Sequence, residues 1–253
     1  MDKKASHPTG KEISFNEEHH RYICDGVTFK SATSLVKTFF PEFDKENISR
    51  FVAQKRKVPQ QQVLEEWEST ANTAIIHGKE VHGYIENALL GKDNTQAKLS
   101  EKKKECLEKI LEEIRDQYDI IEPEKIIFSP ELGVSGMIDL FAKKKGVEVY
   151  VVGDWKTNKK IEMENDYKSF GSGPFKGMPN SNYHHYSIQV NIYKEILLRE
   201  GYIPANAKVE CIITHIPSIE ESFFKNYPAL DYQRQVRELL EILRQEKNLG
   251  IDF

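Results

Sequence analysis

Two aspartates and a lysine lie in a stretch that otherwise has the composition of buried β-structure. Asp139 ends the run Gly-Met-Ile-Asp, and Asp154 begins the triplet Asp-Trp-Lys that ends at Lys156. An unpaired carboxylate inside a sheet is costly, so two of them beside a lysine predict that a cation compensates their charge. Hard divalent metals prefer such oxygen ligands. A metal with an ammonium group beside it is suited to phosphodiester hydrolysis. The alternative interpretation is a solvated strand edge, where Asp and Lys two residues apart are common.

Two apolar runs rich in Val, Ile and Phe position these groups. They are joined by the basic turn 143–146, and they predict an antiparallel β-hairpin in the middle of a sheet. Side chains alternate along a strand, so Asp154 and Lys156 are expected on one face and Trp155 on the other.

A helix is predicted from Thr73 to Leu90 by its apolar spacing. His82 and Glu86, four residues apart, share one face of this helix, and Gly78 lies one turn earlier on the same face. A lone histidine on such a helix is usually structural. The alternative is a ligand, because neutral imidazole can complete a carboxylate metal site.

A second helix is predicted from Tyr186 to Glu200, where Gln189 and Tyr193 share one face. From the spacing alone, this pair is a half-buried helix edge. The remaining expected elements are a scaffold helix, two strands and a final amphipathic helix, at 100–118, 125–129, 209–216 and 231–249.

Four pieces in this order resemble the PD-(D/E)XK nucleases, and within them the RecB-like, phage-type exonuclease branch. They are GKEVHGYIE at 78–86, GMID at 136–139, DWKT at 154–157 and QVNIY at 189–193. Together they span nearly half of the chain. The proline-aspartate pair that names the superfamily is absent, because Asp139 follows isoleucine.

The resemblance implies an α+β fold of the restriction-endonuclease type, with a central mixed β-sheet flanked by helices. It implies catalytic roles for five residues: Asp139, Asp154, Lys156, Gln189 and Tyr193. It implies a metal held by His82, Asp139, Asp154 and the backbone carbonyl of Trp155, with Glu131 and Glu86 as further acidic contacts. Gln189 and Tyr193 are expected to border the site and to contact DNA or the catalytic lysine.

The N-terminal part of the chain is expected to elaborate this core. Residues 1–10 are polar and predict a disordered tail. Residues 11–76 predict a β-meander, marked by the Asp-Gly turn at 25–26, and then a helical cap in which Pro59 separates two helices. Residues 77–253 form the expected nuclease core, in one compact domain overall.

Basic residues on the cap and on a long loop are candidate DNA contacts. Lys55, Arg56 and Lys57 cluster on the cap, and Lys159 and Lys160 begin the loop 158–185. Charged runs are more often solvated faces, and the loop has the alternative of a disordered insertion. A loop of this length is usually functional, and it leaves the strand that carries Lys156. The net charge of −4 excludes a broadly basic surface, so DNA contacts are expected to be local.

Composition narrows the class of protein further. There is no apolar run of membrane-spanning length and no apolar leader segment, so a cytoplasmic location is expected by default. The three cysteines are scattered, which argues against a disulfide framework or a zinc ribbon. Some relatives in the resembled branch hold an iron–sulfur cluster with four cysteines, and three cannot supply that ligation.

The sequence therefore predicts a DNA exonuclease that uses one or two Mg²⁺ or Mn²⁺ ions and acts on a free, single-stranded DNA end, in DNA repair, recombination or phage DNA processing. A structure- or sequence-selective endonuclease on the same core is the alternative enzyme. A catalytically silent DNA-binding module is the non-enzymatic alternative. DNA is the expected partner and a membrane is not, while a homo-oligomer or a recombination partner protein is left open.

Overall fold

A computed structural model of the protein describes residues 3–165, 168–217 and 222–250. Nine strands of the described chain form one sheet in the order β1-β2-β3-β4-β6-β7-β8-β9, with β5 also paired to β6. The strands are β1 (Lys3–Ser6), β2 (Glu12–Asn16), β3 (Arg21–Cys24), β4 (Val27–Ser31), β5 (Tyr118–Ser129), β6 (Val134–Lys144), β7 (Val149–Lys156), β8 (Lys208–His215) and β9 (Lys225–Pro228).

The sheet is mixed. The pairs β4–β6 and β7–β8 are parallel, and the other paired strands are antiparallel. The hairpin β6–β7 has the predicted position, with Leu140 opposite Gly153. Its predicted alternation is also confirmed. Trp155 packs into the core on one face of the sheet, and Asp154, on the other face, accepts a hydrogen bond from Gln189.

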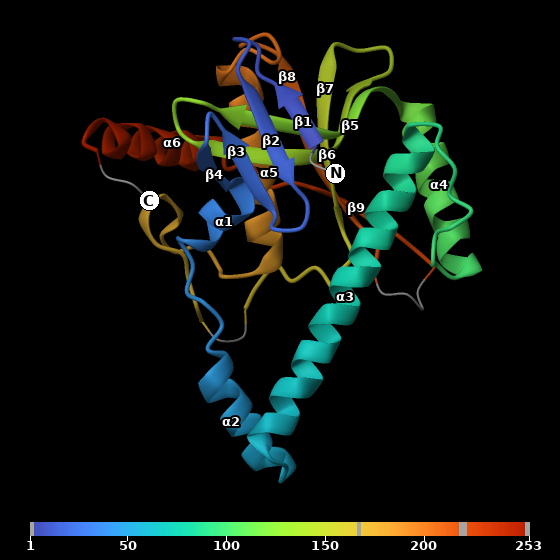
Figure 1. Ribbon diagram of the computed structural model, residues 1–253, viewed down its shortest axis with the longest axis vertical. Helices are drawn as coiled ribbons and strands as arrows, with labels where there is room; N and C mark the ends of the chain where they lie inside the picture. The colour runs from blue at the N-terminus through green and yellow to red at the C-terminus, as the bar shows by residue number, and fades with distance from the viewer. Residues whose placement is uncertain (1–2, 166–167, 218–221, 251–253) are drawn as a thin grey trace.

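Helices cover both faces of the sheet (Figure 1). They are α1 (Ala32–Lys37), α2 (Lys45–Arg56), α3 (Gln60–Leu89), α4 (Glu101–Gln117), α5 (Asn182–Arg199) and α6 (Gln233–Asn248). One apolar core joins the sheet to α1, α5 and α6, and a second joins it to α3 and α4. The predicted coarse fold, a central mixed sheet flanked by helices in an α+β protein, is confirmed. In the described residues, none of the helices has the length and apolar character needed to cross a membrane.

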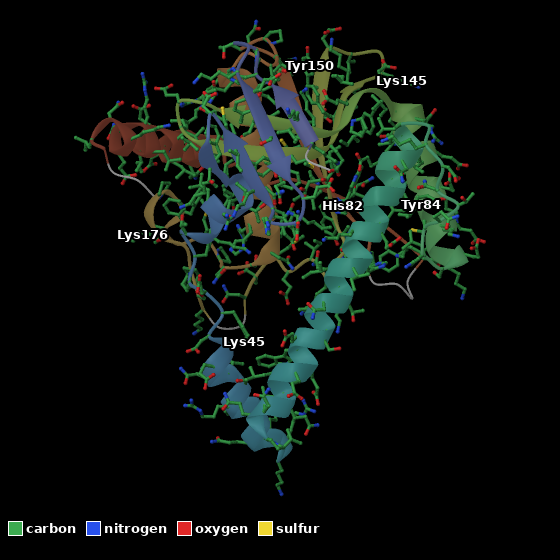
Figure 2. All side chains as sticks on the ribbon, viewed as in Figure 1. Lys45, His82, Tyr84, Lys145, Tyr150 and Lys176 are labelled. Atoms are coloured by element: carbon green, nitrogen blue, oxygen red, sulfur yellow. The ribbon has the colours of Figure 1, made fainter. Side chains whose placement is uncertain are left out.

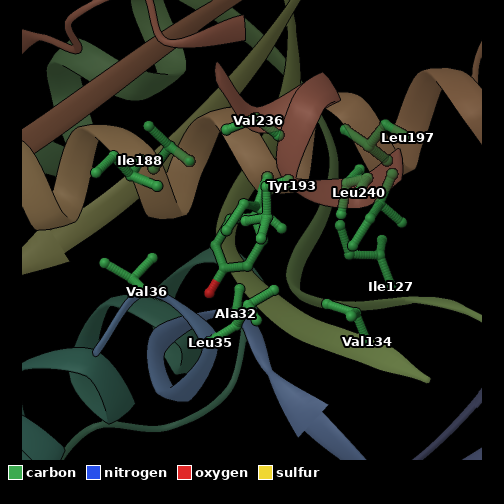
Figure 3. Close-up of a cluster of buried hydrophobic side chains, with 14 of the residues drawn as sticks. Ala32, Leu35, Val36, Ile127, Val134, Ile188, Tyr193, Leu197, Val236 and Leu240 are labelled. Atoms are coloured by element: carbon green, nitrogen blue, oxygen red, sulfur yellow. The ribbon is translucent and has the colours of Figure 1, made fainter. Parts of the chain in front are cut away.

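Tyr193 of α5 lies at the centre of the first core, among Ala32, Leu35 and Val236 (Figure 3). Its ring packs directly on the backbone of β6 at Gly136, where an added Cβ would overlap the ring. Glycine at this position therefore lets α5 approach the sheet closely. Gln189, one turn earlier on α5, is brought to the same face of the sheet.

The predicted disordered tail is wrong for the residues that the structure describes. Lys3–Ser6 forms β1, which pairs with β2 so that Lys3 lies opposite Phe15. Polar side chains do not prevent this, because an edge strand is held by backbone hydrogen bonds and can leave its side chains in solvent. The predicted meander itself is confirmed as β2, β3 and β4.

The predicted helical cap is instead a projecting arm. Helix α3 has 30 residues and runs without interruption from Gln60 to Leu89, a length of about 45 Å. The helix expected from Thr73 is therefore the second half of α3. Helix α2 packs against the first half, and the pair extends away from the sheet (Figure 1). Pro59 is the N-cap of α3, and Lys57, with φ 57°, is the left-handed C-cap of α2.

The loop that follows β7 is folded against the end of α1 in the part that the structure describes, 158–165 and 168–185. It contains a short 3-10 helix, η1 (Gly173–Phe175), in which Phe175 is fully buried. The backbone N–H and the hydroxyl of Ser172 both donate hydrogen bonds to the carbonyl oxygen of Phe39. The alternative of a disordered insertion does not hold for these residues.

Candidate active site

The hairpin β6–β7 brings both predicted aspartates into the protein interior. Asp139 is 8% exposed and Asp154 is 2% exposed. The backbone N–H of Trp155 donates a hydrogen bond of 2.6 Å to Asp139 Oδ2. This bond crosses between the two strands and fixes the direction of the Asp139 carboxylate, leaving Oδ1 for another partner.

A three-residue cluster that could hold a metal forms around Asp139. Ligand atoms of His82, Glu124 and Asp139 all lie within 4.8 Å of one another. His82 Nδ1 is 3.5 Å from Asp139 Oδ1 and 3.8 Å from Glu124 Oε1. The cluster therefore combines one imidazole from α3 with two carboxylates from neighbouring strands.

The other ring nitrogen of His82 is held by the backbone. Nε2 lies 3.1 Å from the carbonyl oxygen of Trp155. When Nε2 carries the proton and donates it to this carbonyl, Nδ1 presents its lone pair to the carboxylates, which is the arrangement of a metal-ligating histidine. The Trp155 carbonyl, predicted to bind metal directly, thus has a hydrogen-bonding partner, and its coordination of a metal stays a prediction.

The charges of the cluster are strongly interdependent. Burial lowers the pKa of His82, but the carboxylates of Asp139 and Glu124 outweigh it and raise that pKa to about 10. Burial raises the pKa of Asp139, but His82 outweighs it, so the net pKa falls. Burial raises the pKa of Glu124. Without a metal, a proton on His82 supplies the positive charge that two buried carboxylates require, so the donor set fits a divalent cation.

Glu124 was not predicted as a site residue. It lies in β5, between the register pairs Lys125–Ile138 and Pro123–Leu140, and therefore across from Asp139. Its φ of 50° is in the left-handed region, which is uncommon for a residue other than glycine. The surrounding run Glu-Pro-Glu-Lys suggests a polar loop. Only the pairing of β5 with β6 indicates that Glu124 is a site residue.

A second group of polar side chains lies beside the cluster, around Asp154. Lys156 Nζ is 2.7 Å from Asp154 Oδ2, an ion pair between a half-buried lysine and a buried carboxylate. The Gln189 amide donates to Asp154 Oδ1 at 3.0 Å and to the Tyr193 hydroxyl at 2.7 Å. Its carbonyl oxygen accepts from Lys156 Nζ at 3.4 Å. One amide from α5 therefore orients both the carboxylate and the ammonium.

Gln189 and Tyr193 are themselves covered. They are only 6% and 3% exposed. The predicted contact with the lysine is confirmed for Gln189, and contact with DNA stays a prediction for both residues. Their helix packs closely on the sheet and leaves little of them accessible.

Burial and the neighbouring charges set the protonation of the Asp154–Lys156 pair. Burial raises the pKa of Asp154, Lys156 lowers it and Asp139 raises it, for a net value of about 6. Burial lowers the pKa of Lys156, but Asp154 and Asp139 outweigh it, and the net pKa rises. Lys156 is therefore a cation at neutral pH.

The cluster opens into a pocket of about 760 Å³ between α3 and the meander. Among its lining residues, Lys3, Lys79 and Lys156 are basic, and Glu17, Glu86, Glu124 and Asp139 are acidic. Several apolar and aromatic side chains complete the wall, namely Phe15, His20, Tyr22, Ile75, Met137 and Tyr186. Tyr186 packs on Lys156, whose Nζ lies 4.6 Å from the centre of the tyrosine ring.

The two further acidic predictions have different outcomes. Glu86 lines the pocket and pairs with Lys3 at 3.0 Å. Glu131 does not lie in the cluster, because its carboxylate pairs with Arg244 of α6 at 2.8 Å and is 60% exposed. Glu131 belongs to the turn after β5, so its predicted role beside the metal is wrong.

None of the five predicted basic DNA contacts lines the pocket. Lys55 and Arg56 end α2 and Lys57 is its C-cap, at the connection to α3, which forms the far end of the arm (Figure 1). Arg56 pairs there with Glu66 at 2.7 Å. Lys159 and Lys160 are exposed just beyond β7. Contact with DNA stays a prediction for these residues.

Comparisons with known proteins add little to this geometry. No protein-family model and no curated protein matches the chain. Among solved structures, a chain from Eubacterium rectale described as a "Putative exonuclease" is 16% identical, with a TM-score of 0.38. The match covers 70% of this chain and 65% of that chain, so this chain spans slightly less than two thirds of that structure. A likeness at this level does not assign an activity, and the proposals below rest on the site.

Proposed function

We propose that the protein is a metal-dependent phosphodiesterase that cleaves nucleic acid. The observation that carries this proposal is the cluster of His82, Glu124 and Asp139, which could hold a metal, beside the ion pair of Asp154 and Lys156. His82, Glu124, Asp139 and Lys156 come from four different elements, α3, β5, β6 and β7, and line one open pocket. Asp154 is buried behind Lys156.

Each group has a distinct task in hydrolysis. His82, Glu124 and Asp139 would hold the divalent cation, with Asp154 as the adjacent carboxylate. A bound Mg²⁺ or Mn²⁺ would supply charge neutralisation at the scissile phosphate and a lower pKa for the attacking water. Lys156 stays protonated because of Asp154, so it acts as a cation that binds a phosphate oxygen and stabilises developing negative charge. Gln189 hydrogen-bonds to both Asp154 and Lys156 and so holds the two side chains in position.

Within this class, the protein is proposed to be a DNA exonuclease that acts on free single-stranded ends. The RecB-like pattern and the walls of the pocket support this. Helix α3, from Ala74 onward, and the β2–β3 turn both line the pocket that holds the acidic cluster. Helix α2 and most of the long loop do not line it, so the pocket walls come from these nearer elements. A strand end enters such a site more easily than a continuous duplex.

Cleavage of a labelled oligonucleotide in Mg²⁺ or Mn²⁺ tests the phosphodiesterase. Asp139→Ala, Asp154→Ala and Lys156→Ala are expected to lower turnover by at least about 100-fold while circular dichroism shows an intact fold. Glu124→Gln is expected to lose metal-dependent cleavage as well, whereas the matched control Glu131→Gln stays active. Retention of more than a few per cent of activity by the Asp154 variant would contradict the mechanism.

Linear and covalently closed single-stranded DNA of the same sequence separate the exonuclease from its alternative. Each phosphodiester is chemically equivalent in the two substrates. Linear strands are expected to be shortened stepwise and circles to resist. Equal rates of cutting would replace the exonuclease with the endonuclease, on the same catalytic groups.

A further inference from the structure

The β2–β3 turn contributes a second kind of surface to the pocket that the acidic cluster does not need. Phe15, His20 and Tyr22 all line the pocket. Phe15 and Tyr22 have ring centres 4.6 Å apart, and His20 lies edge-on to Phe15 at 5.7 Å. The two inner rings are buried, whereas His20 is exposed. His20 is therefore the outermost member of a stack that leads from the core to the open pocket.

The backbone holds His20 in this position. Its φ is 48°, in the left-handed region, and it ends the tight turn between β2 and β3. Its neighbour His19 is also exposed but does not line the pocket. Ile75 of α3 lines the same pocket and is 56% exposed, which leaves a large apolar side chain in water.

The cations of the pocket differ in their partners. Lys79 and Lys156, on α3 and β7, line it and offer cations to a phosphate. Lys3 lies opposite Phe15 but is paired with Glu86, and Glu17 places a carboxylate at the β2–β3 turn, near the aromatic stack. Phosphate is disfavoured beside Glu17, whereas a neutral base that can stack is favoured there. The pocket volume also exceeds what a metal ion and one phosphate group fill.

We infer that His20, with Phe15 behind it and Ile75 in the wall of the same pocket, forms a stacking subsite for one unpaired nucleobase next to the scissile phosphate. This inference rests on the proposed nuclease function and specifies how its substrate is held. A base held in this subsite must be unstacked from its neighbours, so the subsite selects single-stranded nucleic acid over duplex.

Binding of a fluorescent single-stranded DNA of about 12 nucleotides tests the subsite. The measurement uses Ca²⁺ in place of Mg²⁺, and an end-point gel confirms that the strand stays intact. His20→Ala is expected to weaken binding by about 5- to 50-fold, because one stacking contact is lost. His20→Trp is expected to restore or tighten binding. His19→Ala is the matched control and is expected to bind as the wild type does.

A probe that carries one abasic residue distinguishes stacking from a structural effect. The abasic residue is moved stepwise along the strand from each end. At one position it is expected to weaken binding by the wild type, and at that position it is expected to cause no further loss of affinity in His20→Ala. Equal binding by His20→Ala and His19→Ala would overturn the subsite. The subsite would also be overturned if the abasic residue weakened binding by His20→Ala as much as binding by the wild type at every position.

Cleavage in Mg²⁺ separates this inference from the function on which it rests. Cleavage by the wild type with indistinguishable KM values for His20→Ala and His19→Ala leaves the nuclease intact and removes the subsite. Absence of metal-dependent cleavage by the wild type removes the nuclease itself.

Discussion

The two halves of α3 have very different surroundings. In the second half, Val81 and Ile85 are fully buried against α4 and the sheet, and His82 points into the acidic cluster. Earlier in the helix, α2 packs against the beginning of α3, but every residue from Glu68 to Ile76 is exposed (Figure 2). One continuous helix thus carries a residue fixed by packing and a middle segment, Glu68–Ile76, in which no side chain is buried.

The difference teaches where precision is required. An isolated helix is marginal in water, so the exposed segment depends on helix propensity and on local contacts. Thr70 and Thr73 donate their hydroxyl groups to carbonyls one turn earlier, which adds little stability. A ligand such as His82 must hold its position closely, and the chain places it where the core fixes the helix on several sides.

The largest expected difference between the two halves concerns stability. Ile85→Ala removes a buried side chain and leaves a cavity, at a cost of about 2–5 kcal/mol in the free energy of unfolding. Ile76→Ala, in the exposed segment Glu68–Ile76, is expected to change it by no more than about 0.5 kcal/mol. Urea unfolding followed by circular dichroism measures both. Comparable losses in the two variants would mean that the arm packs against the body.

Metal affinity should separate the halves next. His82→Ala is expected to weaken Mn²⁺ binding by about 10- to 100-fold, because one of the three clustered donors is lost. Thr73→Ala, nine residues earlier, is expected to bind Mn²⁺ as the wild type does. Calorimetric titration gives both constants, and identical values for the two variants would return His82 to a structural role.

Acid should act on the body and spare the arm. The sequence between residues 44 and 76 contains no histidine, whereas His185 of α5 packs on Phe40, with ring centres 4.3 Å apart. Burial lowers the pKa of His185 to about 4, with smaller contributions from neighbouring charges. In the unfolded chain, where a histidine has a pKa near 6.5, the residue binds a proton at a higher pH than in the folded protein. Protonation therefore favours the unfolded chain, and the free energy of unfolding decreases as the pH falls from about 6.5 to about 4.

The loss is expected to be about 1–2 kcal/mol after allowance for partial exposure of His185. His185→Leu should remove it, so that the variant's free energy of unfolding falls less than that of the wild type over this pH range. Urea unfolding at several pH values measures the two curves. Parallel curves would show that His185 does not carry the effect.

The smallest expected effect is at the tip of the arm. Lys55→Ala combined with Lys57→Ala should weaken binding of a long DNA strand by about 3- to 10-fold and reduce its salt dependence. Binding of a strand of about six nucleotides should not change, because such a strand would not reach from the pocket to the tip. Fluorescence anisotropy at two salt concentrations measures both, and an equal loss for the short strand would place these lysines nearer the pocket than the structure does.

The sequence predicted the parts of the site that are local in the chain. The hairpin with Asp139 and Asp154, the shared face of Asp154 and Lys156, and the spacing of Gln189 from Tyr193 all follow from the periods of strands and helices. The catalytic assignments themselves remain predictions.

Features that depend on contacts between distant segments were missed. Glu124 reaches the cluster only through the register of β5 against β6, which includes an irregularity near Glu122. Lys3–Ser6 becomes a strand because β2 offers its edge. The arm was interpreted as a cap because a helix pattern does not give the direction in which a helix runs relative to the sheet. Glu131 was assigned by its distance along the chain from Asp139, but the turn after β5 directs it to α6 instead.

The uninterrupted length of α3 also sets a footprint. From Gln60, at the base of the turn that holds Lys57, to His82 is 22 residues of helix, or about 33 Å. That distance matches about ten nucleotides of a helical strand. A strand gripped at both ends would be shielded over that span. Once an exonuclease had shortened its substrate below that span, the grip at the tip would be lost and the last fragments would leave undigested. The size of the smallest oligonucleotides that accumulate would then report the length of one helix.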